Sequence, residues 1–294
     1  MENNNLYRAI SKDGSVVIAA CDSTDIVGRA AKIHRTSLTA TAAFGRALTA
    51  ASLMGSMLKN EGNTLTLQFK CDGPCGNICC VSDYKGNVRG YIDSPSAELA
   101  PNSLGKLDVG GAVGKGTLCV VRDLGFDEPT VGMCEVESGE IAEDITAYFA
   151  KSEQVPTACA LGVLVDKNFC VNGAGGFIVQ LLPFADEGII TTLENNLKNV
   201  SSVSHMIKEG KTPIDIIDTV FSGIEYDLLD KTHTEFKCNC SRKRYEKIMI
   251  SLGKEELERL KSEDEQVETV CSFCGEKYIF SKQDLERFIG EATR

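Results

Sequence analysis

The segments EFKCNCSRKRY (residues 235–245) and TVCSFCGEKY (residues 269–278) decide how the end of this chain is organised. They hold two close cysteine pairs, Cys238 with Cys240 and Cys271 with Cys274. Two such pairs in one short stretch are typical of a four-thiolate zinc site. The second pair is an ordinary zinc knuckle, whereas the first is unusually tight because one residue separates its cysteines. We therefore predict one zinc ion per chain, with these four cysteines as its ligands.

Residues 232–294 form the predicted zinc-binding domain, which has few large apolar side chains for a core. These are Phe236, Tyr245, Ile248, Leu252, Leu257, Leu260, Phe273, Tyr278, Ile279, Phe280, Leu285 and Phe288. A domain with so small a core is only marginally stable unless a metal ion or disulfide cross-links it. Structural zinc can contribute roughly 10 kcal/mol or more of apparent binding energy. His233 is a competing ligand candidate, but four thiolates already complete a tetrahedron, so we interpret it as a surface residue.

The zinc site has two interpretations, one purely structural and one as a redox switch. Zinc keeps its cysteines as thiolates, and the thiolate is the form that oxidants attack. Cysteines so close in sequence can also close a disulfide on each other, so each pair carries its own resolving cysteine. Oxidation would then remove the ligands, and a domain that zinc holds folded would come apart. The spacing of the cysteines fits both interpretations.

The composition indicates a globular protein in a reducing compartment. Of its 294 residues, 43% are hydrophobic and 25% charged, which allows a sizeable core. The start of the chain, MENNNLYRAI, lacks the basic and apolar regions of a secretory signal, so we expect a cytoplasmic protein with no membrane span. Its 13 cysteines are then expected as thiols, metal ligands or redox centres. The net charge of −11 disfavours nucleic acid as a partner.

Residues 1–183 combine strand and helix signals. Alternating apolar and polar residues predict strands within residues 7–22 (a hairpin around the turn KDGS), 63–74, 83–93, 116–125, 130–139 and 157–183, the last with a glycine-rich bend. Helical periodicity predicts helices within residues 23–34, 36–60 and 140–154. The helix at 36–60 is rich in Ala, Leu and Met, so it should lie in the core. We predict an α+β domain with a mostly antiparallel sheet.

The chain changes character after Pro183. Residues 184–231 show helical periodicity and no strand signals, with helices expected at 186–210 and 212–224. We interpret this segment as a helical connector packed on another part of the protein. In the zinc-binding domain, helices are expected at 242–253 and 254–263, between the two cysteine pairs.

A second cysteine cluster occurs in CDGPCGNICC, residues 71–80. Its members are Cys71, Cys75, Cys79 and Cys80. They suggest a metal or cluster site, but the spacing differs from the usual iron–sulfur patterns and the segment alternates as a strand does. We favour buried thiols that act as small hydrophobic residues. The same interpretation applies to Cys21, Cys119, Cys134, Cys159 and Cys170, which sit within apolar runs.

No catalytic or nucleotide-binding motif is complete. The glycine-rich VGGAVGKGT (residues 109–117) lacks both the first P-loop glycine and the Ser or Thr after its lysine, and NGAGG (172–176) lacks the dinucleotide-binding spacing. The three histidines are well separated, so no nucleophile–base pair is indicated. We therefore predict that the protein is not an enzyme.

The whole chain resembles the redox-regulated heat-shock holdase chaperones, the bacterial thirty-three-kilodalton heat-shock protein family. The resemblance is carried by the two cysteine pairs and by FGRALTAASLMGSMLK (44–59), RDLG (122–125), SGEIAEDITAYFAKSEQVPTACALGVLV (138–165) and GGFIVQLLP (175–183). CDGPCGNICC is a departure, because family members commonly carry glycine and aliphatic residues in place of these cysteines.

The resemblance implies a reduced, zinc-bound form that is inactive. Oxidation would form the disulfides Cys238–Cys240 and Cys271–Cys274, release zinc, and unfold the C-terminal unit and the connector. The exposed surface would bind unfolding client proteins without ATP, and the oxidised form would be a homodimer.

Two functions from other classes stay open. A zinc-ribbon nucleic-acid binder is suggested by the cysteine pairs and by SRKR (residues 241–244), although a solvated helix start is the more common meaning of such a run and the acidic net charge weighs against this function. A thiol oxidoreductase is suggested by Cys271 and Cys274, because C-x2-C is also a redox motif.

Overall fold

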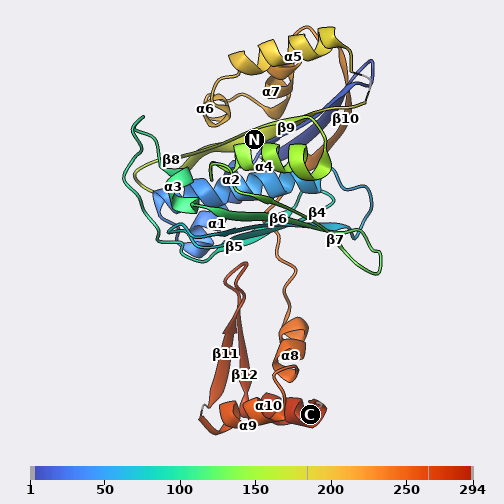
Figure 1. Cartoon of the computed structure of the whole chain (residues 1–294). Helices are drawn as coiled ribbons and strands as arrows, with labels where there is room; N and C mark the ends of the chain where they lie inside the picture. Colours follow the sequence, from blue (N-terminus) through green and yellow to red (C-terminus); the bar gives the residue numbers. More distant parts are fainter. Residues whose placement is uncertain (1–3, 184, 264, 293–294) are drawn as a thin grey trace. The chain divides into compact units, whose positions relative to one another are not determined.

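The structure is a computed structural model that describes residues 4–183, 185–263 and 265–292. The chain forms two compact units, and the boundary between them falls between Lys237 and Cys238. Strands in all three of the sheets described pair antiparallel, and helices accompany them. The predicted α+β class with antiparallel sheets is therefore confirmed (Figure 1).

The first sheet of the first unit has the strand order β10-β1-β2-β9-β8. Its strands are β1 (Asn5–Ser11), β2 (Val16–Asp22), β8 (Thr157–Val165), β9 (Val171–Leu181) and β10 (Tyr226–His233). The hairpin predicted over residues 7–22 is confirmed as β1 and β2. Strand β10 has no signal in the sequence, because most of its side chains are exposed and they do not alternate. It forms only by pairing with β1, more than 200 residues earlier in the chain.

The second sheet of this unit has the strand order β5-β4-β3-β6-β7. Its strands are β3 (Thr64–Cys71), β4 (Ile78–Asp83), β5 (Val88–Ile92), β6 (Gly116–Asp123) and β7 (Thr130–Glu135). All were predicted as strands, and β3 shows why: Leu65, Leu67 and Phe69 are buried on one face, whereas the residues between them are not. This alternation fixes which face of the sheet meets the core.

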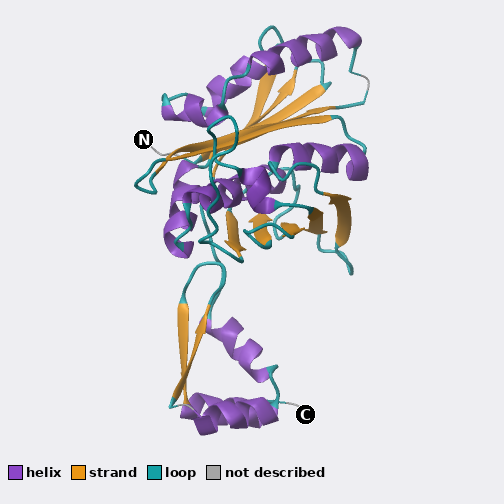
Figure 2. Ribbon diagram, turned by 60° about the vertical axis from the view of Figure 1, so that its left-hand side comes forward, coloured by secondary structure: helices purple, strands orange, loops and turns teal. Residues whose placement is uncertain are grey.

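Helices fill the space between the two sheets (Figure 2). They are α1 (Thr24–His34), α2 (Leu38–Gly55), α3 (Val109–Val113), α4 (Ala142–Tyr148) and the π-helical turn η1 (Phe149–Glu153). Helix α2 contacts strands of both sheets, and from Thr39 to Gly55 every residue except Arg46 is buried. Its small Ala, Gly, Ser and Thr side chains permit close contact on all sides, as its composition predicted. Ser37 caps it by accepting a hydrogen bond from the Ala40 amide.

Three short helices cover the opposite face of the first sheet (Figure 1). They are α5 (Glu187–Asn199), α6 (Val203–Lys208) and α7 (Pro213–Val220). Their apolar side chains pack on strand residues such as Ile18, Phe177 and Val179 to form one cluster. Helices α5 to α7 lie within the segment predicted as a helical connector, where α5 and α6 replace one predicted helix. The end of that segment, from Tyr226, is strand β10, which was not predicted, and position 184 lies outside the described residues.

The glycines of NGAGG lie inside strand β9, where a glycine-rich bend was predicted. The bend itself is residues 166–170. A Cβ atom on Gly173 would lie 2.4 Å from the carbonyl oxygen of Ser204 in α6, which is shorter than real Cβ contacts. The glycine therefore allows the backbone of α6 to lie directly on the sheet, and this packing explains the motif that resembled a nucleotide-binding loop.

The segment just before the first cysteine pair belongs to the first unit. The backbone of Val88 donates to Glu235 and accepts from Lys237, at 3.0 and 2.9 Å. Between them, the side chain of Phe236 is 2% exposed, and the guanidinium of Arg29 lies 5.9 Å from its ring centre. The expectation that Phe236 belongs to the zinc-domain core is therefore wrong. The hydrogen-bonded ladder with Val88 holds this residue in place instead.

Replacing Phe236 with Ala is expected to destabilise the first unit by about 3 kcal/mol, because it removes a buried aromatic ring and leaves a cavity. Urea unfolding of the reduced, zinc-loaded chain, followed by circular dichroism, measures this change. Phe126→Ala is the matched control, since its ring is 77% exposed. A control effect above about 0.5 kcal/mol, or equal effects of the two changes, would contradict the assignment.

The second unit contains a hairpin and three helices. These are α8 (Arg242–Ile250), α9 (Lys254–Glu263), β11 (Gln266–Val270), β12 (Lys277–Ser281) and α10 (Lys282–Glu291). The core consists of Met249, Leu257, Phe280, Leu285, Phe288 and Ala292. Helices α8 and α9 were predicted, whereas α10 was not. Ile248, Leu252 and Ile279 were expected in the core but are exposed.

Most thiols outside the two pairs are buried as expected. Cys21, Cys75, Cys79, Cys80 and Cys119 are buried, and Cys71, Cys134 and Cys159 are half-buried. Burial raises the pKa of the Cys75 thiol to about 11, so this thiol stays protonated and unreactive at neutral pH. Cys170 is the exception. It was expected in the core but is exposed in the turn between β8 and β9, where its amide donates to the Asp166 carboxylate.

Candidate metal centre

The four cysteines of the two pairs come together in the second unit. All four Sγ atoms lie within 4.8 Å of one another. Two of the separations join different pairs: Cys238 to Cys271 at 3.8 Å and Cys240 to Cys274 at 3.4 Å. A tetrahedral site with Zn–S bonds of about 2.3 Å places its sulfurs about 3.8 Å apart. The four thiols therefore fit the ligand set of a structural zinc ion.

Backbone hydrogen bonds shape the second pair into a knuckle. Strand β11 ends at Val270 and β12 begins at Lys277, and the turn between them carries Cys271 and Cys274. The Cys271 amide donates to the Glu276 carbonyl, and the Gly275 amide donates to the Cys271 carbonyl, both at 2.8 Å. Gly275 has a φ of 73°, which glycine adopts without strain. The first pair lies in extended chain just before Ser241, the N-cap of α8.

The thiols are in unequal electrostatic surroundings. Burial raises the pKa of Cys238 and of Cys274, and hydrogen bonds with neighbouring thiols raise that of Cys274 further. Burial acts in the same direction on Cys271. There, the Tyr245 hydroxyl and the amides of Cys274 and Phe273 outweigh it and lower the pKa to about 7. One thiolate thus forms readily at neutral pH, whereas four adjacent thiolates would repel unless a cation offset their charge.

Two tyrosine hydroxyls contact the sulfur cluster. Tyr278 on β12 donates to Cys240 Sγ at 3.1 Å, and the Tyr245 hydroxyl on α8 lies close enough to Cys271 to lower the pKa of that thiol. The two rings stack with their centres 4.6 Å apart. Sequence reasoning placed both residues in the core and overlooked their hydroxyls. The available signal was the choice of Tyr rather than Phe, because a partly buried Tyr usually has a hydrogen-bond partner.

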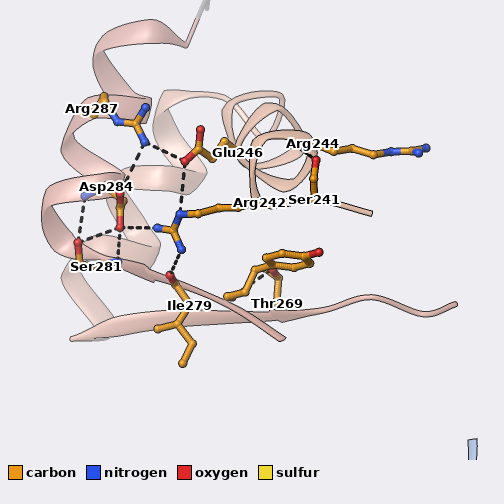
Figure 3. A network of polar contacts seen from close by, with 10 residues as sticks. Ser241, Arg242, Arg244, Glu246, Thr269, Ile279, Ser281, Asp284 and Arg287 are labelled. Carbon is orange, nitrogen blue, oxygen red and sulfur yellow. Dashed lines mark hydrogen bonds and ion pairs between the residues drawn. The ribbon is translucent and has the colours of Figure 1, made fainter. Parts of the chain in front are cut away.

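Arg242 joins the first cysteine pair to the rest of the unit (Figure 3). Its guanidinium donates to the Ile279 carbonyl at 2.8 Å and to Asp284 at 3.0 Å, and it stacks over the Phe280 ring. Glu246 lies between Arg242 and Arg287, with each ion pair at 3.5 Å or less. The first basic residue of SRKR therefore has a structural role through these contacts, although it is exposed, as Lys243 and Arg244 are. His233 lies on β10 as an exposed residue and is outside the sulfur cluster.

The comparisons with known proteins agree with this geometry. The family model described as Hsp33 protein matches residues 4–281. The chain belongs to the Hsp33 family. The resemblance inferred from the sequence is thereby confirmed.

Hsp33 relatives match the chain over nearly its full length. The 33 kDa chaperonin of Ruminiclostridium cellulolyticum is 46% identical, covering 98% of this chain and 99% of that protein. The 33 kDa chaperonin of Caldanaerobacter subterraneus subsp. tengcongensis is 44% identical and covers 98% of both. The crystal structure of the 33 kDa chaperonin (heat shock protein 33 homolog) from Thermotoga maritima has a TM-score of 0.92 at 35% identity, again with 98% coverage of both chains.

Membership of the Hsp33 family places the chain among chaperones and not among enzymes. Among the helices of the described residues, none is long and apolar enough to cross a membrane.

The cysteines of CDGPCGNICC do not form a second metal-binding group in the part of the Hsp33 chain that the structure describes. Cys79 and Cys80 are neighbours on strand β4, so their side chains point to opposite faces of the sheet. Three of the four are buried, Cys79 and Cys80 in β4 and Cys75 in the turn before it. This arrangement supports the interpretation of these residues as packing thiols.

We predict that replacing Cys71, Cys75, Cys79 and Cys80 together with serine leaves one zinc per chain. Elemental analysis of the purified protein measures the metal content. Because serine buries new hydroxyls, the same four positions changed to alanine provide a control for misfolding. A second equivalent of zinc or iron that is present in the wild type and absent from both variants would overturn the prediction.

Proposed function

We propose that the chain is a redox-regulated, ATP-independent holdase that binds unfolding proteins after its zinc-binding cysteines are oxidised. The observation that carries this proposal is the cluster of four thiols within 4.8 Å in a unit with a small core. Such a unit depends on its metal for folding, and the ligands that hold the metal are also the oxidisable groups. The family likeness to proteins named 33 kDa chaperonin supports the same conclusion.

In the reduced form, Cys238, Cys240, Cys271 and Cys274 would hold one zinc ion as thiolates. The bound ion would supply charge neutralisation and cross-link the segment before α8 to the β11–β12 knuckle. The chain's own residues support this arrangement: backbone amides shape the knuckle, and Arg242 ties α8 to β12 and α10.

Peroxide is the proposed oxidant. One thiolate of a pair attacks it, which leaves a sulfenic acid and releases hydroxide. The second thiolate then displaces the remaining hydroxide and closes the disulfide. Each disulfide thus takes two electrons from the pair and reduces one peroxide. Four thiols are consumed per chain, and none is left to bind zinc.

The disulfide pairing decides whether the unit comes apart. Sulfurs of different pairs lie 3.4 and 3.8 Å apart, so cross-pair disulfides are the competing products. A cross-pair bond would tie the first pair to the knuckle and hold the unit together. Bonds within pairs, Cys238–Cys240 and Cys271–Cys274, leave the two segments free to separate. We propose the pairing within pairs, and peptide mass mapping of the oxidised protein distinguishes the two products.

The proposed client-binding surface lies beneath the connector, residues 184–231. Helices α5 to α7 cover a sheet face that carries Val16, Ile18, Phe177 and Val179. None of these helices exceeds 13 residues, so each depends on tertiary packing for its stability. Their release would expose both the sheet face and the apolar sides of the helices. Exposed apolar surface of this kind binds unfolded chains and also favours a homodimer.

The test compares reduced, zinc-loaded protein with peroxide-treated protein by light scattering of a heat-denatured client, without ATP. We expect only the oxidised form to suppress aggregation and reductant with zinc to reverse the effect. Equal suppression by both forms would contradict the redox regulation. Catalytic reduction of insulin would favour a C-x2-C oxidoreductase, and salt-dependent DNA binding would favour a zinc-ribbon nucleic-acid binder. A cytoplasmic location, where thiols stay reduced until oxidative stress, is part of the proposal.

A further inference from the structure

The two tyrosines beside the sulfur cluster are arranged reciprocally. Tyr245 follows the first cysteine pair in the chain, yet its hydroxyl lies beside Cys271 of the second pair and lowers the pKa of that thiol. Tyr278 follows the second pair, yet its hydroxyl donates to Cys240 of the first pair, at 3.1 Å. The stacked rings, 4.6 Å apart and inclined by 23°, hold both hydroxyls in place. Each cysteine pair therefore has one sulfur beside a tyrosine hydroxyl.

We propose that Tyr245 and Tyr278 set how fast the cysteines react with oxidant, by donating hydrogen bonds that make two of the sulfurs less nucleophilic. The inference rests on the proposed redox function. A thiolate attacks peroxide through a sulfur electron pair, and a hydrogen bond to that sulfur withdraws electron density from it. Hydrogen bonds to ligating sulfurs also tune thiolate metal centres in general. The tyrosines would thus keep the zinc-bound form from oxidising at low peroxide levels.

The expected size of the effect follows from the dependence of thiolate nucleophilicity on basicity. Its Brønsted coefficient is about 0.4–0.5, so a hydrogen bond that lowers sulfur basicity ten- to a hundredfold slows attack by about three- to eightfold. Removing one hydroxyl should therefore accelerate the reaction of its own pair by about that factor. The oxidation rate of the other pair should change little. Mass spectrometry can measure the oxidation rate of each pair separately.

The experiment uses the full-length, zinc-loaded chain with Tyr245→Phe, Tyr278→Phe and the double change. Phenylalanine keeps the stacked rings and removes only the hydroxyls. Tyr84→Phe is the matched control, because Tyr84 lies in the β4–β5 turn of the first unit and contacts Lys85. The readouts are the rate of thiol loss in each pair with peroxide and the rate of zinc release to a metal indicator. A third readout is the sulfur-to-cobalt charge-transfer band of the Co²⁺-substituted protein.

We expect Tyr245→Phe to speed oxidation of the Cys271 pair and Tyr278→Phe that of the Cys240 pair, with Tyr84→Phe at the wild-type rate. The cobalt band should move to lower energy in both tyrosine variants, since their sulfurs are more electron-rich. Rates within twofold of wild type with an unmoved band would overturn the proposal. The proposal would also be overturned if the tyrosine variants lost zinc to a chelator without peroxide as much faster than wild type as they do with peroxide. That result would show that the changes weaken the zinc site itself. If wild-type protein keeps its zinc in peroxide, the proposed function fails instead, and the cobalt band still tests the hydrogen bonds.

Discussion

Chelating zinc from the reduced protein is expected to unfold the second unit while the first unit stays folded. The second unit buries six side chains in its core, and three of its candidate core residues are exposed. For so small a unit, apolar burial and the loss of chain entropy nearly balance. Structural zinc contributes roughly 10 kcal/mol or more, so its removal should shift the balance fully to the unfolded state. The first unit has its own core between two sheets, so we expect it to stay folded after chelation.

Circular dichroism and limited proteolysis of metal-loaded and chelated protein measure this effect. The chelated sample should be cleaved after Lys237 and protected before it. Cys271→Ser should resemble chelated protein even with excess zinc, because it removes a proposed zinc ligand at a residue that is only 3% exposed. Cys170→Ser, at the exposed thiol of the β8–β9 turn, is the matched control and should behave as wild type.

Peroxide should produce the same unfolding by removing the ligands. Zinc release, the loss of four free thiols and the gain of client binding are expected together, and reductant with zinc should reverse all three. Chelation alone should leave the thiols able to bind metal again. Two results would contradict the proposed redox switch. One is oxidised protein that suppresses aggregation while it retains zinc, and the other is oxidised protein that loses zinc without gaining client binding.

Local patterns in the sequence were sufficient to predict the elements that depend mainly on their own side-chain periodicity. The KDGS hairpin, the alternation of Leu65, Leu67 and Phe69, and the apolar helix α2 all follow from side-chain periodicity. The gathering of the four cysteines also follows from sequence, because the chemistry of zinc requires four ligands and the spacing supplies them in two turns.

The features that were missed depend on partners distant in the chain. Strand β10 exists because β1 pairs with it, and Phe236 is buried because the backbone of Val88 holds it against the first unit. Helix α10 did have a local signal, since Ser281 and Asp284 form a capping box at its start. The tyrosine–sulfur contacts join residues more than 25 positions apart, and periodicity carries no information about such contacts.

Oxidation is expected to open the connector while the sheet beneath it stays closed. Amides of α5, α6 and α7 should lose protection from hydrogen exchange by about 10³-fold or more, equivalent to about 4 kcal/mol. These helices are short, and the only apolar surface that the structure gives them among the described residues is the face of the first sheet and one another. Once released, they lack the length to remain helical in water. Hydrogen–deuterium exchange with mass spectrometry on reduced and oxidised protein measures the change.

Strands β8 and β9, residues 157–182, provide the internal control for this prediction. They are hydrogen-bonded along their whole length, and β9 is also paired with β2, so oxidation should leave their protection unchanged. A second control is oxidised Cys170→Ser, which should open its connector as the wild type does. Equal protection of α5 to α7 in both redox states would argue against release of the connector. Loss of protection that extends into β9 would instead show that the whole first unit unfolds, and the covered sheet face could not then be the client-binding surface.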